Sequence, residues 1–254
     1  MADDLALALE LAEISDRLTM IRYRAGDLRV QEKPDLTPVT DADRAVEEAL
    51  RERLAEVRPH DAVLGEEYGD DDAAPTERRW IVDPIDGTKN YVRGIPIWGT
   101  LIALQQEGEV SVGVVSAPSL CRRWWATRGG GAFLNGARLE VSAVRDLHDA
   151  VLLWSGIEEW DAVGQGDAVI ELARRCWRSR GVGDFWQYML VAEGAAEIAV
   201  DPVVSLWDLA APMVIVEEAG GRFSDLSGAR TPDGGSAMAS NGQLHDEALA
   251  LLRR

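Results

Sequence analysis

One segment of the chain joins a buried strand to carboxylates that a buried strand does not tolerate alone. The apolar run Trp80-Ile81-Val82 is followed directly by Asp83-Pro84-Ile85-Asp86-Gly87-Thr88. Two negative charges three residues apart at the end of a buried strand cost free energy unless a cation compensates them. The segment therefore restricts the chain to folds in which this strand end opens into a polar, cation-binding site.

The residues between and after these carboxylates predict how they meet. Pro84 has no N–H group and interrupts strand pairing, and Gly87 lets the backbone turn. Asp83 and Asp86 can then converge while the Ile85 carbonyl turns toward the same point. Carboxylate and carbonyl oxygens without His or Cys favour a hard ion such as Mg²⁺ over zinc.

The spacing of apolar residues predicts helices first and a run of strands after them. Three- and four-residue spacing predicts a helix over Leu7–Ile21 and a second helix from a cap at Thr40 to about Val57. Short apolar runs predict strands at 62–64, 80–82, 99–104, 110–115 and 123–126. From about residue 151 strands alternate with helices at about 167–177, 185–194, 209–219 and 243–252. We expect a surface loop at 69–78.

These elements predict an α/β fold with two different halves. The first half, about residues 1–145, has an α+β texture, and the second half, about 146–254, has the alternation of an α/β layer. A chain of 254 residues is long enough for one large domain or two closely packed halves. We therefore expect a single domain built from two packed subdomains.

The charge of the chain excludes several classes of partner. Lys and Arg number 26 against 44 Asp and Glu, which gives a formal net charge of −18. Such a chain repels phosphate backbones, and no basic cluster with aromatic neighbours offsets this, so we expect no nucleic-acid partner. Uncharged stretches such as 110–121 are shorter than the roughly 18 residues that span a bilayer. The start Met1-Ala2-Asp3-Asp4 lacks the basic residues of a signal peptide, so we expect no membrane partner and a cytoplasmic location.

Two further acidic residues suit the same cation. Glu66, in Gly65-Glu66-Glu67, ends a short predicted strand, and Asp208, in Trp207-Asp208, lies at a predicted helix start. Each has an ordinary alternative explanation, because Asp208 can be a helix cap and Glu66 a solvated loop acid. Together with the Asp83–Thr88 motif, the segment 207–212 and Glu218-Ala219-Gly220-Gly221, they resemble the inositol monophosphatase family of Mg²⁺-dependent phosphomonoesterases. The resemblance spans nearly the whole chain.

The resemblance implies a layered αβαβα sandwich over residues 1–254, a homodimer and a small-molecule phosphate ester as substrate. It implies that two or three Mg²⁺ ions are bound by Glu66, Asp83, Asp86, Asp208 and the carbonyl oxygen of Ile85. It also implies that Thr88, Asp43 and Glu66 are the catalytic residues, with Thr88 and Asp43 orienting the attacking water. Asp43 has an alternative explanation as a capping box with Thr40, and both roles can hold together.

The resemblance further implies a phosphate site beside the metals. A helix that starts at Gly87-Thr88 presents free N–H groups to an anion. Asp86, Gly87, Thr88 and Lys89 are expected to contact the phosphate. Lys89 departs from the family, which often has a second Thr there, and its cation suits an anionic ligand, although a solvated Lys is equally ordinary.

Residues around the metal site are expected to select the ester. Asp201 lies where the family has an acidic residue that contacts the alcohol, and Asp184 lies where inositol-directed members have small residues, although it can also be a loop cap. Arg180, in Arg178-Ser179-Arg180, is expected to assist at the phosphate or to order the loop. The segments 178–180 and 188–194 are similar to the histidinol-phosphate phosphatases of this family. A carboxylate beside aromatic residues favours a cationic, planar leaving group over a neutral polyol.

Other aromatic and imidazole side chains have simpler explanations. Trp98, Trp124 and Trp125 are expected in the core, whereas Trp186 is the candidate for the substrate pocket. His245, like the other two His residues, lies in a surface-like context. Two alternative functions stay open: an inositol-1-monophosphatase or broad small-molecule phosphatase, and a protein of this fold that acts mainly through a protein partner.

Overall fold

The computed structural model describes residues 2–33, 37–70 and 77–253. The helices are α1 (Ala2–Arg22), α2 (Asp41–Val57), α3 (Thr88–Arg93), α4 (Ile157–Ala162), α5 (Gly166–Arg175), α6 (Asp184–Ala192), α7 (Leu206–Glu218) and α8 (His245–Leu252). The strands are β1 (Val30–Glu32), β2 (Pro38–Thr40), β3 (Ala62–Gly65), β4 (Gly69–Asp70), β5 (Arg78–Asp86), β6 (Gly99–Gln106), β7 (Glu109–Ala117), β8 (Arg122–Thr127), β9 (Gly131–Leu134), β10 (Ala137–Arg138), β11 (Val151–Trp154), β12 (Arg178–Gly181), β13 (Ile198–Asp201), β14 (Arg222–Ser224) and β15 (Ala237–Ser240). Short 3₁₀ turns lie at Pro118–Leu120 and Leu147–Asp149.

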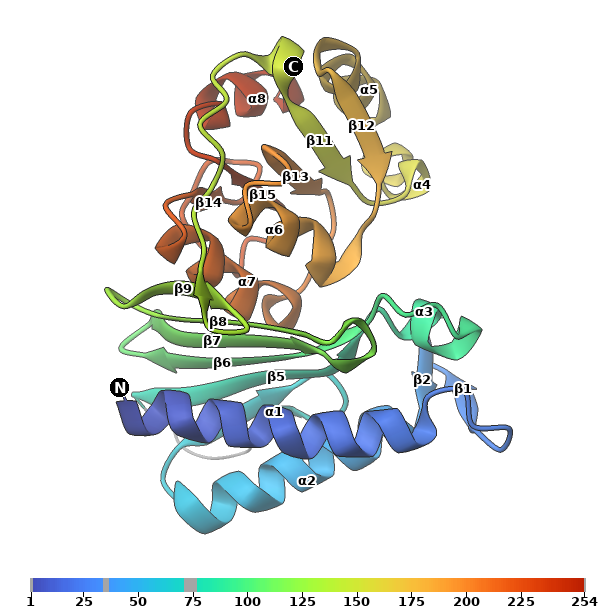
Figure 1. The fold of residues 1–254 in the computed structure, drawn as a ribbon. Coiled ribbons are helices and arrows are strands. Elements are labelled where there is room, and N and C mark those ends of the chain that lie inside the picture. The colour runs from blue at the N-terminus through green and yellow to red at the C-terminus, as the bar shows by residue number, and fades with distance from the viewer. Residues whose placement is uncertain (1, 34–36, 71–76, 254) are drawn as a thin grey trace.

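Helices and sheets alternate in five layers (Figure 1). Helices α1 and α2 cover one face of the first sheet, α6 and α7 lie between the two sheets, and α5 and α8 lie beyond the second sheet. This order confirms the predicted αβαβα sandwich.

The two sheets differ in strand direction. The first has eight strands in the order β10-β9-β8-β7-β6-β5-β3-β4, and its pairs are antiparallel except for the parallel pair β3 and β5. The second has five strands in the order β12-β11-β13-β15-β14, in which β11 is parallel to both β12 and β13. A separate two-stranded sheet joins β1 to β2.

Apolar side chains fill each space between layers. Ile81 and Val82 are neighbours on β5 and point to opposite faces, as the two-residue period of a strand requires. Val82 joins the core beneath α1 and α2, and Ile81 joins the core shared with α7. A third core between the second sheet and the outer helices contains Leu152, Ile198, Leu172 and Leu249. The cores fix the order of the layers.

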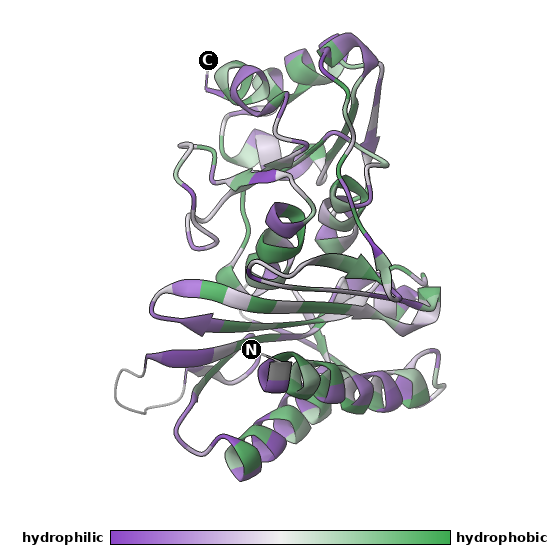
Figure 2. Ribbon diagram, turned by 60° about the vertical axis from the view of Figure 1, so that its left-hand side comes forward, coloured by the Kyte–Doolittle hydropathy of each residue, from purple (hydrophilic) through white to green (hydrophobic). Residues whose placement is uncertain are grey.

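Local sequence accounts for helices α1 and α2, each of which carries both hydrophilic and hydrophobic residues (Figure 2). Thr40 caps α2 in a capping box with Asp43, as predicted. In α1 the apolar spacing predicts that Ile21 faces the core, and this is wrong, because Ile21 is 74% exposed. The buried face of that turn passes through Ser15 and Thr19 instead, and the Ser15 hydroxyl bonds to that of Thr100 in β6.

Two other sequence interpretations change in the folded chain. His245 does not lie at the surface: it is 0% exposed, and its two ring nitrogens each lie 2.9 Å from a hydroxyl, that of Ser224 or Ser240. Burial lowers the pKa of His245 to about 4, so the ring is neutral. Of the loop predicted over residues 69–78, Gly69-Asp70 form β4, residues 71–76 lie outside the described part, and Arg78 begins β5.

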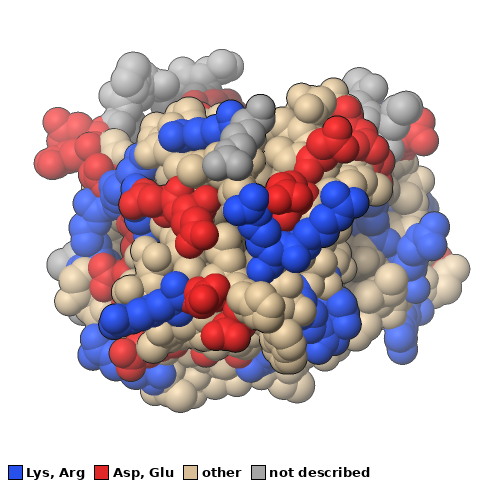
Figure 3. All heavy atoms as spheres, turned by 90° about the horizontal axis from the view of Figure 1, so that it is seen from above, with Lys and Arg blue, Asp and Glu red and all other residues tan. Residues whose placement is uncertain are grey.

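Acidic and basic side chains are interspersed on the face viewed from above (Figure 3). No helix in the described ranges is both long enough and apolar enough to cross a membrane.

Candidate metal and phosphate site

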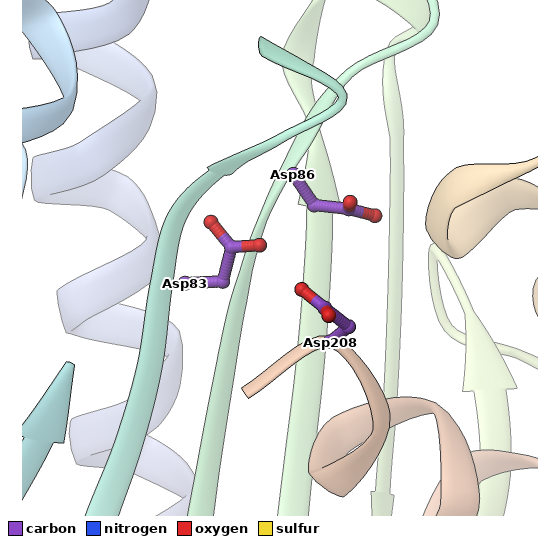
Figure 4. Close-up of side chains that lie close together, drawn as sticks. All are labelled: Asp83, Asp86 and Asp208. Carbon is purple, nitrogen blue, oxygen red and sulfur yellow. The ribbon is translucent and has the colours of Figure 1, made fainter. Parts of the chain in front are cut away.

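Three carboxylates from two distant segments converge where β5 ends (Figure 4). Asp83 and Asp86 come from the last residues of β5, and Asp208 comes from the first turn of α7. Each contributes an oxygen, and these oxygens all lie within 4.8 Å of one another. Asp83 is 1% exposed and Asp86 is 9% exposed, so the cluster is largely shielded from water.

The backbone of β5 produces this convergence through a local irregularity. The strand pairs with β6 up to Asp83 and again at Asp86, and the register shifts between these residues. Pro84 interrupts the pairing, as predicted, but the strand does not end there and continues to Asp86. Gly87 then adopts φ 81°, and a Cβ at this position would lie 3.0 Å from the carbonyl oxygen of Ile97. Only glycine fits this turn comfortably.

Backbone N–H groups orient the three carboxylates. Ile85 donates to Asp83 at 3.0 Å, Ser205 donates to Asp208 at 2.8 Å, and Phe185 donates to Asp86. Within the described residues, no Lys or Arg forms an ion pair with any of the three carboxylates. The cluster is therefore held in place without being neutralised.

The electrostatics of the cluster favour a bound cation. Burial, together with the charges of the neighbouring carboxylates, raises the pKa of Asp83 and of Asp86 well above the usual range. Burial also raises the pKa of Asp208 to about 7. An oxygen-only set of buried, mutually repelling carboxylates fits a hard divalent cation, because such an ion supplies the missing positive charge.

A second group of oxygens adjoins the cluster at the start of α3. The hydroxyl of Thr88 lies 2.8 Å from the Ile85 carbonyl and 3.2 Å from Asp43 Oδ1. The other oxygen of Asp43 accepts from Thr40 in the capping box. Burial raises the pKa of Asp43 to about 6. Asp43 thus belongs to the capping box of α2 and also contacts Thr88.

Glu66 also reaches the site, but it has a cationic partner. The Lys33 ammonium lies 2.8 Å from Glu66 Oε1 and 2.7 Å from Glu67 Oε1. Glu66 lines the same cavity as Asp83 and Asp208, and its charge raises the pKa of Asp83 further, after burial. Among the ion pairs of the described residues, Lys33 is the only cationic partner of Glu66.

Two adjoining cavities make one continuous site. A cavity of about 270 Å³ contains Glu66, Asp83 and Thr88, and a cavity of about 400 Å³ lies beside it. Both are lined by Asp86, Lys89, Asp184, Val203, Val204 and Asp208. The larger volume is of the size that holds a small organic molecule.

The larger cavity lies at the carboxyl ends of three parallel strands. Trp154 ends β11, Gly181 ends β12 and Asp201 ends β13, and all three line it. Parallel sheets commonly bind ligands at this edge, where backbone and loops open into a crevice. The metal cluster and the ends of the second sheet thus face the same space.

Two buried carboxylates of this cavity have their own hydrogen-bond donors. Asp184 has φ 51° and accepts from the Asn90 amide at 3.0 Å. Asp201 accepts from Tyr188 and Gln187. Burial is the main cause that raises the pKa of Asp184 to about 6 and of Asp201 to about 8. Neither carboxylate has an ion pair within the described chain, so both favour a cationic ligand.

The sequence model of the inositol monophosphatase family matches residues 3–254. The chain belongs to this family. It is 57% identical over 255 residues to a histidinol-phosphatase of Mycobacterium tuberculosis, with 98% of each chain covered. It is 50% identical to a histidinol-phosphatase of Streptomyces coelicolor, covering 99% of this chain and 97% of that one. A solved inositol monophosphatase structure from Thermotoga maritima superposes with a TM-score of 0.89 at 30% identity, covering 99% of this chain and 97% of that one.

The predicted assignment to this phosphatase family is confirmed. Most of the predicted site residues line the two cavities. The smaller cavity brings together Glu66, Asp83, Ile85, Asp86, Gly87, Thr88, Lys89 and Asp208. The larger cavity adds Asp184 and Asp201. Asp43 reaches the group through Thr88.

Two candidates do not line either cavity. Arg180 is exposed on β12, and its guanidinium donates to the carbonyl of Ser179 at 2.7 Å. Trp186 packs against the core between the sheets, so the choice of this aromatic residue for the pocket is wrong. The aromatic residues that line the larger cavity are Trp154, Phe185 and Tyr188. Trp98 and Trp124 are fully buried, as expected, and Trp125 is half-buried and stacks on Phe133.

The sequence analysis did not identify one further carboxylate of the larger cavity, beyond Asp184 and Asp201. Glu159 on α4 lines the larger cavity, and its charge raises the pKa of Asp201. The available signal was the end of the strand at Trp154, since segments that follow parallel strands gather at one edge. Family membership alone does not indicate this residue, because α4 lies outside the motifs that carry the resemblance.

Proposed function

We propose that this phosphatase hydrolyses L-histidinol phosphate to L-histidinol and inorganic phosphate. The observation that carries the proposal is the charge of the larger cavity. Its lining includes Glu159, Asp184 and Asp201 in addition to Asp86 and Asp208 of the cluster, and Lys89 is the single Lys or Arg among the described lining residues. A bound cation balances the cluster but leaves these three acids facing the alcohol part of the substrate.

L-histidinol matches that environment better than a neutral polyol does. Its ammonium and its imidazole, when protonated, are cations, and carboxylates in a partly desolvated cavity select for cations through charge complementarity. Trp154 adds an aromatic wall on which a planar ring or a cation can lie. The relatives from M. tuberculosis and S. coelicolor bear the name histidinol-phosphatase, which supports the same substrate.

We propose two or three Mg²⁺ ions held by Glu66, Asp83, Asp86, Asp208 and the Ile85 carbonyl. When bound, Mg²⁺ lowers the pKa of a coordinated water and neutralises phosphate oxygens and the leaving alkoxide. The oxygen-only donor set and the raised pKa values of the buried acids support this choice. The Lys33 ammonium contacts Glu66 Oε1, and the second carboxylate oxygen of Glu66 would be its metal ligand.

The remaining chemistry is assigned to side chains at the start of α3. Thr88 orients the attacking water, and Asp43, 3.2 Å from its hydroxyl, takes up the proton that the water loses. The new P–O bond forms as the P–O bond to the alcohol breaks, and the alkoxide leaves to be protonated by solvent. Gly87 and Lys89 contact the phosphate, and no covalent enzyme intermediate is needed.

Cytoplasmic location and a homodimer are part of the proposal, and both rest on the resemblance to the family.

The competing activity is hydrolysis of inositol 1-phosphate, since more distant relatives bear the name inositol-1-monophosphatase. The acids of the larger cavity argue against a neutral polyol as the preferred alcohol.

The test is phosphate release from L-histidinol phosphate and from inositol 1-phosphate side by side, at fixed Mg²⁺ and with EDTA. We expect kcat/KM for L-histidinol phosphate to exceed that for inositol 1-phosphate by at least about a hundredfold, which corresponds to about 2.7 kcal/mol. EDTA should abolish both activities reversibly. Equal rates on the two esters contradict the substrate, and full activity in EDTA contradicts the metal centre.

A further inference from the structure

A buried carboxylate on α2 holds the turn that carries Glu66. Glu47 is 0% exposed, and its Oε2 accepts from the backbone N–H of Glu67 at 2.8 Å. Its Oε1 accepts from the N–H of Tyr68 at 3.2 Å and from Arg51 Nε at 2.9 Å. The carboxylate thus supplies acceptors to two successive N–H groups immediately after Glu66, which would otherwise lack a partner in a turn.

The same turn is fastened on its other side to β5. The N–H of Glu66 donates to the carbonyl of Val82 at 3.2 Å, next to Asp83. Gly65 leaves the space that the Glu47 carboxylate fills, because a Cβ on Gly65 would lie 1.9 Å from Glu47 Oε1. The backbone on both sides of Glu66 is therefore fixed by contacts that the side chain of Glu66 does not make.

Helix α2 links this turn to the other half of the site. Asp43 and Glu47 are four residues apart, so they lie on one face of the helix, one turn from each other. Asp43 contacts Thr88 at the start of α3, and Glu47 contacts the turn after β3. One rigid helix face thus sets the separation between Thr88 and Glu66.

We propose that Glu47 is a positioning residue for the metal centre: it aims Glu66 at the cluster of Asp83, Asp86 and Asp208. This inference rests on the metal ligands proposed above. Groups that hold a metal ligand in place change metal affinity about 10–100-fold when they are removed. Gln at this position keeps the size of Glu47 but turns an N–H₂ group toward a backbone N–H, so one of the two turn contacts is lost.

Direct metal binding tests the inference on the full chain. The probe is Mn²⁺, which suits oxygen ligands and whose free aquo ion is measured by electron paramagnetic resonance. We expect Glu47→Gln to weaken Mn²⁺ binding at least about tenfold. We also expect a similar rise in the Mg²⁺ concentration for half-maximal phosphate release, with kcat recovering at high Mg²⁺. Glu48→Gln, an exposed neighbour on the same helix, is the matched control and should bind Mn²⁺ as the parent chain does.

A second variant approaches the contact from the opposite side. Gly65→Ala adds a methyl group that meets the flexible end of Glu47 and displaces its carboxylate, at a backbone conformation open to Ala. It should weaken Mn²⁺ binding in the same way, and it decides the matter if Glu47→Gln does not fold. Parent-like Mn²⁺ binding in the folded variants, with only a lower melting temperature, overturns the positioning role. Failure of the parent chain itself to bind Mn²⁺ or Mg²⁺ overturns the metal centre instead.

Discussion

The site contains two acidic regions that are built in opposite ways. Asp83, Asp86 and Asp208 face one another. After burial, the like charges of nearby carboxylates raise the pKa values of Asp83 and Asp86, with Glu66 first for Asp83 and Asp184 first for Asp86. Asp201, equally buried, accepts hydrogen bonds from Tyr188 and Gln187, and the Tyr188 bond acts to lower its pKa. The first region needs a cation from outside, whereas the second is organised by its own donors. The two regions thus fit the two roles proposed for them, one in binding a metal and one in binding the substrate.

The largest effect is expected in the first region. Asp83→Asn should lower kcat/KM at least about a thousandfold, because metal-based charge stabilisation is worth several kcal/mol and each 1.4 kcal/mol is tenfold. In EDTA the same variant should melt at a higher temperature than the parent chain, since one of three mutually repelling acids becomes neutral. Phosphate release and thermal melting measure the two effects. Asp233→Asn, on the exposed surface, is the control and should change neither; retained activity in Asp83→Asn refutes the metal assignment.

Asp184→Asn probes the second region. Loss of a charged hydrogen-bond acceptor for the alcohol, worth about 1.5–3 kcal/mol, should lower kcat/KM for L-histidinol phosphate about 10–100-fold. Inositol 1-phosphate should lose less, because it offers no cation. Steady-state kinetics with both esters give the comparison, and Glu158→Gln on the exposed side of α4 controls for surface charge. An equal loss on the two esters removes the selective role of Asp184.

The pH dependence of stability, measured with and without Mg²⁺, tests the buried acids without a mutation. Acids whose pKa is raised by folding, such as Asp208 to about 7 and Asp201 to about 8, bind more protons in the folded chain than in the unfolded chain near neutral pH. The stability of the metal-free protein should therefore rise as the pH falls from 8 to 6.5. The lowered pKa of His245 acts in the opposite direction, but mainly below its ordinary value of 6.5.

Mg²⁺ should oppose this trend, because it binds the ionised form of the cluster and must displace protons. Thermal melts at pH 8 and 6.5, each with EDTA and with Mg²⁺, measure both slopes. We expect the melting temperature to rise by a few degrees toward pH 6.5 in EDTA, and the gain from Mg²⁺ to be greater at pH 8. A metal-free protein that is more stable at pH 8 contradicts the uncompensated cluster.

The smallest effect is expected from the donors of Asp201. Tyr188→Phe removes one hydrogen bond to this carboxylate, worth about 1 kcal/mol, so kcat/KM for L-histidinol phosphate should fall about fivefold. The EDTA melting difference caused by Asp83→Asn should not change, because Tyr188 serves the other region. Tyr68→Phe, at a half-exposed ring, is the matched control. A loss in Tyr188→Phe as large as that of Asp83→Asn would erase the distinction between the regions.

Much of the fold and part of the site follow from local sequence. Thr40 with Asp43 predicts the start of α2, and Asp83-Pro-Ile-Asp-Gly-Thr predicts a strand end where two carboxylates converge, because both depend on residues within one turn. The ordinary explanation of Asp208 also holds, since it forms a capping box with Ser205 while joining the cluster. The division into halves near residue 145 and the roles of the site residues stay predictions.

Tertiary structure alone decided which distant residues meet. The sequence does not show that Glu159 and Trp154 line the larger cavity, that Arg180 lines neither cavity, or that His245 is buried. Propensity and periodicity act over a few residues, whereas these positions depend on strand order and on how layers pack, which join segments far apart in the chain. Glu47 is the clearest example. In the sequence it resembles a solvated Glu on a charged helix, whereas in the folded chain its carboxylate accepts hydrogen bonds from the N–H groups of Glu67 and Tyr68.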